Sequence, residues 1–146
     1  MKIMISACLL GENCKYSGGN NQNEKLLQLL SGHTVIPVCP EVLGGLPTPR
    51  SPAEIVNGCV TNRDGISVDR AFRQGAEKAL EIAKQEQPDL IVLQSRSPSC
   101  GLKQIYDGTF SGTLIPGQGV FAEMARKEGF ILKDAEDITA EGAIKP

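Results

Sequence analysis

Short apolar runs alternate along this chain with longer segments in which apolar residues recur at helical spacing. The runs that predict strands lie at residues 2–7, 34–38, 90–93 and 130–132. The segments that predict helices lie at 23–30, 69–86 and 119–127, with Asp69 as the expected N-cap of the longest helix. Strands and helices that alternate in this way form a parallel sheet covered by helices. The pattern therefore predicts a three-layer, Rossmann-like α/β fold with a mostly parallel sheet and helices on both faces.

Glycine, proline and asparagine mark the segments between these elements. Residues 11–20 predict a loop, and the proline-rich residues 40–52 predict a rigid loop without regular structure. Residues 53–68 predict a hairpin with Asp64-Gly65 at its turn. The end of the chain after Asp137 is expected to be frayed or to form a short helix. Because there is no internal repeat and no linker, residues 1–146 are expected to form a single domain.

The bulk composition narrows the function classes. The formal net charge of −2 is spread along the chain without a basic block, which argues against a large nucleic-acid footprint. No apolar stretch approaches a membrane span, which needs about 18 residues. The apolar N-terminus has one basic residue and no small-residue cleavage site, so it predicts a strand rather than a signal peptide. We therefore expect a cytoplasmic protein, in which five cysteines indicate metal binding or catalysis rather than disulfides.

Three of the cysteines follow predicted strands. Cys8 and Cys39 stand at the carboxyl ends of the first two strands, and Cys100 lies in the loop after the third. Ligands of open parallel sheets bind outside the carboxyl ends of the strands. If the three strands are neighbours, the three thiols meet at one edge of the sheet. The spacing therefore predicts a thiolate metal site.

Three converging thiolates leave several metal groups open. A structural zinc site normally has four ligands in close pairs such as CxxC, which this chain lacks, and His33 stands at the wrong end of its strand. A catalytic zinc with three thiolates and a water stays an alternative, as does an iron–sulfur cluster with one open iron. Cys14 is either a fourth ligand or a spectator. Cys59 is expected to be structural or exposed.

Polar residues surround the cysteine loops. Glu41 follows Cys39 closely enough to face the same cavity as a general acid or base. The hydroxyl of Ser97 or of Ser99 can relay a proton beside Cys100, and Ser99 is also a candidate substrate contact. The cationic candidates for holding a carbonyl or phosphate oxygen of the substrate are Arg50, Lys15 and Lys103.

Four sequence blocks together resemble a known family. They are SACLLGENCKYSGG at 6–19, CPEVLGGLPTPR at 39–50, SRSPSCG at 95–101 and GQGVFAEMARKEGF at 117–130. In this order they are similar to the thiouracil desulfidase family, formerly a bacterial domain of unknown function. The resemblance implies a [4Fe–4S] cluster bound by Cys8, Cys39 and Cys100. It places the catalytic glutamate on Glu41 and an assisting serine on Ser97. A variable residue of the family falls on Cys14, which is then not a required ligand.

The resemblance also implies the reaction. Family members remove sulfur from small thiolated pyrimidines, either 2-thiouracil or 4-thiouridine monophosphate. Relatives with an additional domain act on thiolated tRNA, so a free base or nucleotide is expected here, with no tRNA or membrane partner. In the implied chemistry the open iron binds the thiocarbonyl sulfur, water deprotonated by Glu41 adds to the ring carbon, and sulfide leaves without net electron transfer.

Two alternatives to a desulfidase stay open from the residues alone. One is a sulfurtransferase that carries a persulfide on Cys100 or Cys8, which requires a thiol of lowered pKa. The other is a metal-binding module without catalytic activity.

Overall fold

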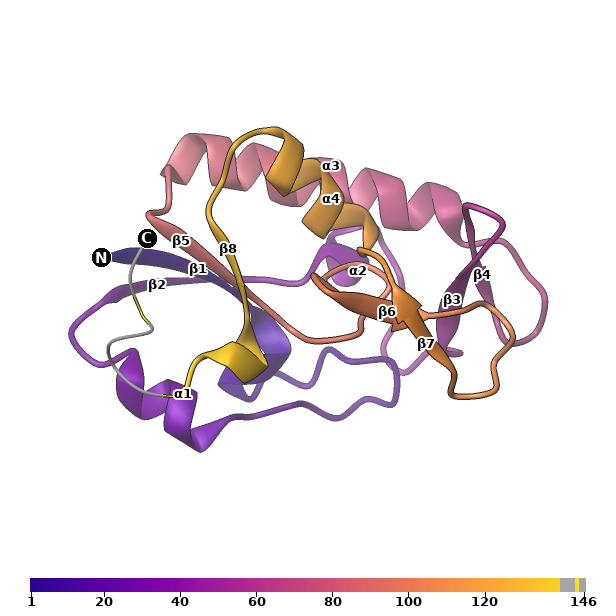
Figure 1. The fold of residues 1–146 in the computed structure, drawn as a ribbon, viewed down its shortest axis with the longest axis horizontal. Coiled ribbons are helices and arrows are strands. Elements are labelled where there is room, and N and C mark those ends of the chain that lie inside the picture. The colour runs from indigo at the N-terminus through magenta and orange to yellow at the C-terminus, as the bar shows by residue number, and fades with distance from the viewer. Residues whose placement is uncertain (140–143, 145–146) are drawn as a thin grey trace.

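The computed structural model describes residues 1–139 and 144, and Figure 1 shows their arrangement. Within these residues the central sheet has four parallel strands in the order β2-β1-β5-β8. Their bounds are Thr34–Val38 for β2, Lys2–Ser6 for β1, Leu90–Leu93 for β5 and Leu132–Asp134 for β8. Ile3 lies opposite both Val35 and Leu90, so β1 lies between β2 and β5. Cys39 follows β2, and the loop with Cys100 follows β5. The predicted parallel sheet is confirmed.

Helices cover both faces of this sheet, because successive strand residues point to opposite sides. Ile3 and Ile5 are fully buried against Leu26 of helix α1, Glu24–Leu29. Met4 faces the other way, toward Phe72 of the long helix α3. Helix α3 spans Asp69–Glu86 and packs with α4, Val120–Lys127, on the face opposite α1 (Figure 1). The predicted three-layer architecture with helices on both faces is therefore confirmed.

The last strand begins later than the pattern predicts. Strand β8 spans Leu132–Asp134 instead of residues 130–132. Gly129 has φ +89° and ends helix α4, and the Phe130 amide donates to the carbonyl of Ala125. Phe130 is thereby tied to the end of the helix and packs against the core, so pairing with β5 starts two residues further on.

The predicted hairpin exists, but its turn lies elsewhere. Strands β3, Ala53–Val56, and β4, Cys59–Asn62, are joined by Asn57-Gly58, both at positive φ, which is the geometry of a two-residue hairpin turn. Asp64-Gly65 forms a second turn after β4, in which the Gly65 amide donates to the Asn62 carbonyl. A further hairpin, of β6, Gln104–Tyr106, and β7, Leu114–Pro116, was not predicted. Figure 1 shows both hairpins beyond the carboxyl end of the central sheet.

The prediction that residues 40–52 exclude regular structure is wrong at their start. Pro40–Leu43 form the short helix α2, because proline is well suited to the first position of a helix, where its missing N–H has no partner to lose. Helix α2 packs directly on α3. A Cβ on Gly75 of α3 would lie 1.8 Å from the Pro40 carbonyl oxygen, so only glycine permits this approach.

Two smaller expectations concern the ends of helices. Asp69 is the first residue of α3 and not its N-cap, which is Val68; the Asp69 carboxylate instead accepts the Val60 amide at 2.9 Å and so ties β4 to α3. The 3-10 helix η2 spans Ala135–Asp137. The frayed or helical ending predicted after Asp137 falls mainly on 140–143 and 145–146, which lie outside the described residues. In the part of the chain that is described, no helix is long and apolar enough to cross a bilayer.

Candidate metal and catalytic site

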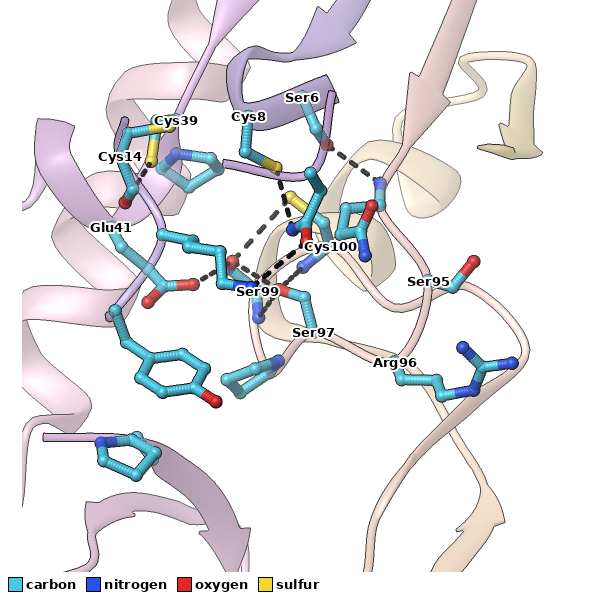
Figure 2. Close-up of a pocket in the computed structure, with 18 of the residues that line it drawn as sticks. Ser6, Cys8, Cys14, Cys39, Glu41, Ser95, Arg96, Ser97, Ser99 and Cys100 are labelled. Atoms are coloured by element: carbon cyan, nitrogen blue, oxygen red, sulfur yellow. Dashed lines mark hydrogen bonds between the residues drawn. The ribbon is translucent and has the colours of Figure 1, made fainter. Parts of the chain in front are cut away.

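A cavity of about 470 Å³ opens at the carboxyl ends of β2, β1 and β5. Its wall includes the side chains of Cys8, Cys14, Cys39 and Cys100 (Figure 2). The sequence-based prediction that Cys8, Cys39 and Cys100 meet at one edge of the sheet is therefore confirmed, and Cys14 joins them. In residues 1–139 and 144, no three His, Cys, Asp or Glu side chains converge closely enough to hold a single metal ion, so the thiols are spread around the cavity.

Each thiol is placed by a different local device. Cys39 directly follows β2 and is the N-cap of α2. Cys8 lies in the 3-10 helix η1, Ala7–Leu10, immediately after β1, and the Asn21 side chain reaches its sulfur at 3.6 Å. Cys100 sits in a tight loop in which its own amide donates to the Ser97 hydroxyl at 3.0 Å.

Two glycines permit close backbone packing at the Cys100 loop: Gly119 lets helix α4 approach the loop, and Gly101 lets the loop close on itself. A Cβ on Gly119, the N-cap of α4, would lie 2.5 Å from the carbonyl carbon of Ser99, and one on Gly101 would lie 2.7 Å from the Ser97 carbonyl oxygen. The SPSCG and GQGVF blocks therefore form one compact unit behind the cavity.

Burial dominates the acid–base properties of the thiols. It raises the pKa of Cys100 to about 12, although hydrogen bonds from Ser6 and Ser99 act in the opposite direction. It also raises the pKa of Cys8, against the effect of Asn21, and the nearby Cys39 and Glu41 add to the rise. These groups are neutral thiols unless a cation lies among them. A metal supplies that charge and converts the thiols into thiolate ligands.

Cys14 shares this environment. Burial raises the pKa of its thiol, and the neighbouring Cys39 adds to the effect. The Cys39 sulfur lies 3.9 Å from the carbonyl oxygen of Cys14. The loop that carries Cys14 therefore lies against the ligand loop after β2.

Glu41 is held at both carboxylate oxygens. Its Oε1 accepts Nε of Arg50 at 3.2 Å and Nη2 at 3.1 Å. Its Oε2 accepts the Ser99 hydroxyl at 2.7 Å (Figure 2). Ser99 has one hydroxyl hydrogen and three possible acceptors in reach, the other two being the Ser97 hydroxyl at 2.9 Å and the Cys100 sulfur at 3.7 Å. The shortest bond, to a charged acceptor, is the strongest one. With the Ser97 hydroxyl 2.9 Å from that of Ser99, the three side chains form a continuous proton path from Ser97 to Glu41.

Arg50 has a different role from the one predicted. Its side chain is only 8 % exposed, and its remaining N–H groups donate to the Cys14 carbonyl at 2.9 Å and to Pro47 and Thr48, each at 3.1 Å. A guanidinium has five N–H donors, and all five are used within the protein. Arg50 is therefore built to fix Glu41 and the Cys14 loop, and it has no donor left for a substrate phosphate.

The two lysines predicted to hold the substrate differ in their position relative to the cavity. Lys15 lines the cavity and lies 3.4 Å from the Asn21 side chain, so it can contact a bound molecule. Lys103 does not line the cavity; its ammonium pairs with Asp137 at 2.9 Å, and both side chains are more than half exposed. The expectation that Lys103 faces the site is therefore not met, because the unpredicted hairpin β6–β7 directs the chain after Gly101 along the surface.

Sequence reasoning missed several residues of the cavity wall. Ser6 accepts the Gln94 amide at 3.0 Å and so joins the ends of β1 and β5. Asn21 directly follows the loop 11–20 and contacts Cys8, but it lies outside all four sequence blocks, so no motif marks it. The tertiary arrangement alone adds further lining residues from distant parts of the chain, which are Tyr16, Glu54, Arg63, Arg96, Tyr106 and Phe110.

The family model for 2-thiouracil desulfurase matches residues 3–137 of this chain. The chain belongs to the 2-thiouracil desulfurase family. The match spans every cysteine of the cavity together with Glu41 and both serines.

Two proteins are similar to this chain over most of their length. The uncharacterised protein YbbK of Bacillus subtilis (strain 168) is 38 % identical over 138 residues, which cover 88 % of this chain and 91 % of YbbK. Among solved structures, the [4Fe–4S]-dependent thiouracil desulfidase TudS is 36 % identical, with a TM-score of 0.87 over 94 % of this chain and 92 % of TudS. At this similarity the family member described here shares the complete fold with TudS.

Proposed function

We propose that this protein removes sulfur from a thiolated pyrimidine, 2-thiouracil or 4-thiouridine monophosphate, and releases it as sulfide. A [4Fe–4S] cluster held by Cys8, Cys39 and Cys100 is the proposed cofactor. The observation that carries the proposal is the meeting of these three strand-end thiols with Glu41 in one cavity. The name of the similar protein TudS, a [4Fe–4S]-dependent thiouracil desulfidase, supports it.

The donor set fits such a cluster. Iron–sulfur clusters are bound by cysteine thiolates, and soft sulfur ligands favour them over hard cations. Cys8 and Cys100 are buried thiols that need a cation beside them to ionise. When bound, a cluster with three protein ligands supplies a Lewis-acidic iron for the thiocarbonyl sulfur.

The protein's own groups carry the protons. Glu41 takes a proton from the water that adds to the ring carbon, and Arg50 and Ser99 hold its carboxylate in place for this. Ser97 exchanges a proton with the ring nitrogen, and Ser99 connects it to Glu41. The balance is thiocarbonyl plus water to carbonyl plus hydrogen sulfide, with no net electron transfer.

The persulfide alternative is less well supported by the site. A persulfide carrier needs an accessible thiol of lowered pKa. Cys100 is 4 % exposed and Cys8 is 9 % exposed, and burial raises the pKa of both. Buried thiols with raised pKa values fit a metal site better than a persulfide carrier.

The test is anaerobic reconstitution followed by two measurements. Iron and acid-labile sulfide are quantified, and sulfide release is followed with 2-thiouracil and with 4-thiouridine monophosphate. We expect a loaded cluster and sulfide release from at least one compound. Absence of iron would contradict the proposal. A loaded cluster without sulfide release would indicate a cluster-binding module without catalytic activity. The Cys39→Ser variant is expected to lose the cluster, whereas Cys59→Ser, whose thiol lies outside the cavity near Ser67, is expected to keep it.

The substrate is proposed to be a small molecule in a cytoplasmic setting. A cavity of about 470 Å³ is in the range of small-ligand sites, which argues for a base or nucleotide rather than a tRNA or a membrane. Comparing kcat/KM for 2-thiouracil and 4-thiouridine monophosphate, in the native protein and in Lys15→Ala, decides whether the phosphate contributes to recognition.

A further inference from the structure

The cavity contains one thiol more than the proposed three-cysteine site requires. Cys14 stands in the segment between η1 and α1, which has no helix or strand of its own. It nevertheless lines the same cavity as the three strand-end cysteines and shares an electrostatic environment with Cys8 and Cys39. Figure 2 shows Cys14 beside Cys39 on one side of the cavity, across from Cys8 and Cys100.

The position of Cys14 is built into the fold. Its carbonyl oxygen accepts Nη2 of the buried Arg50 at 2.9 Å, and its amide donates to the Glu12 carbonyl at 2.9 Å. Arg50 also binds Glu41 through the same nitrogen, so one guanidinium holds both the Cys14 loop and the carboxylate. A surface cysteine that met the cavity by accident would not need this anchor.

We propose that Cys14 is a fourth, exchangeable ligand of the cluster, bound while no substrate is present and displaced by the thiocarbonyl sulfur. The proposal rests on the proposed function. Clusters of this type ordinarily have four cysteine ligands, and the cavity offers four. In the exchange, one iron–sulfur bond to Cys14 breaks and one to the substrate sulfur forms; no electron moves, and the displaced thiolate takes up a proton from water.

The surroundings of Cys14 explain why it can leave while the others stay. Cys8 and Cys39 continue directly from the ends of paired strands, and Cys100 is fixed by the bonds of its own loop. At Cys14 the anchors act on the backbone carbonyl and amide, so the side chain can change rotamer without breaking them. Cys14 is also partly exposed, which leaves room for the displaced thiol.

The experiment compares anaerobically reconstituted holoprotein, labelled with 57Fe, as wild type, Cys14→Ala, Cys14→Ser and the matched control Cys59→Ser. Mössbauer spectra are expected to show four similar iron sites in wild type and Cys59→Ser. Both Cys14 variants are expected to keep the cluster but to show one distinct iron. On exposure to air, they should lose that iron faster by about tenfold, the scale on which loss of one partner changes metal affinity. The growth of the three-iron EPR signal measures this rate.

A second arm tests the exchange itself. In a Glu41→Gln background, which is expected to bind but not convert substrate, addition of 2-thiouracil should make the spectra with and without Cys14 alike. Identical resting spectra and identical air-decay rates in wild type and both Cys14 variants would overturn the proposal. Loss of the entire cluster in both variants would overturn exchangeability and make Cys14 a required ligand. Failure of the proposed function is seen separately, as wild-type protein without iron or without sulfide release.

Discussion

Among the residues that the structure describes, two hollows of nearly equal size lie at opposite ends of the sheet. The cysteine-lined cavity measures about 470 Å³ and the other about 460 Å³. The second lies at the amino ends of β5 and β8 and is lined by Lys84, Gln87, Pro88, Asp89, Glu128, Gly129, Phe130 and Ile131. It has charged residues but no thiol.

The two hollows differ in what happens to their charges. In the second, Lys84 and Glu128 approach to 3.5 Å with about half of each side chain exposed, at 53 % and 45 %. Such pairs are screened by water and contribute little. In the first, Arg50 and Glu41 are 8 % and 15 % exposed. The volume of a hollow therefore does not identify a functional site. At the first hollow, the loops that follow the parallel strands place charged groups away from water, and electrostatic interactions are stronger there than in solvent.

The largest effect is expected for Glu41→Gln, which removes the proposed catalytic carboxylate of the cysteine-lined cavity. This change keeps the shape of the side chain but removes the base, so sulfide release should fall by about 10²- to 10⁴-fold. Visible absorbance and iron content should stay at the wild-type level, because the substitution removes no thiol. Glu123→Gln, which breaks the exposed Glu123–Lys127 pair on α4, is the matched control and should keep full activity. Turnover that survives Glu41→Gln would show that another group is the base.

A smaller effect is expected for Arg50→Lys. Lysine keeps the charge but cannot make the forked contacts to Glu41 and Cys14, so the carboxylate loses its fixed position. A misplaced catalytic group costs up to about 10²-fold in rate. We expect kcat to fall while KM for 2-thiouracil and the iron content change little. Arg73→Lys, at the exposed pair with Asp69, should leave both constants unchanged. A rise in KM with normal kcat would instead make Arg50 a substrate contact.

A third substitution tests the scaffold behind Glu41. Gly75→Ala places a methyl group 1.8 Å from the Pro40 carbonyl oxygen and forces α2 away from α3. Overpacking of this kind lowers the free energy of unfolding by about 1–3 kcal/mol. Thermal unfolding measures it, and kcat should fall with it because α2 carries Glu41. Gln74→Ala, on the exposed side of the same helix, should stay within about 0.5 kcal/mol of wild type. Equal stability of the two variants would contradict the contact.

The smallest effect is expected at the second hollow. Lys84→Ala removes an exposed ion pair, so stability should change by no more than about 0.5 kcal/mol. Iron content and sulfide release should be unchanged, measured beside the Arg50→Lys variant. A loss of activity in Lys84→Ala would show that the two ends of the sheet are coupled.

The local pattern of apolar residues predicts the strands of the central sheet. It fails to predict their bounds where contacts between distant residues set them. The runs at 34–38 and 90–93 became strands with the predicted bounds, since each is apolar and continuous. Strand β8 starts later because Phe130 is held by α4. The hairpin turn at Asn57-Gly58 is by contrast a local signal, since Asn-Gly favours a two-residue turn with both residues at positive φ. The β6–β7 hairpin was missed, because its strands have three residues each and too little periodicity to detect.

The meeting of Cys8, Cys39 and Cys100 was determined by the sequence itself. Each follows a short apolar run that forms a strand, and parallel neighbours end at the same edge. The roles of Arg50 and Cys14 were decided only by the tertiary structure. One guanidinium, through five directed N–H groups, joins a glutamate nine positions away and a carbonyl thirty-six positions away. No local pattern encodes such contacts, since they join the first turn of α2 and the Cys14 loop through the folded path of the chain and not through the period of a helix or strand.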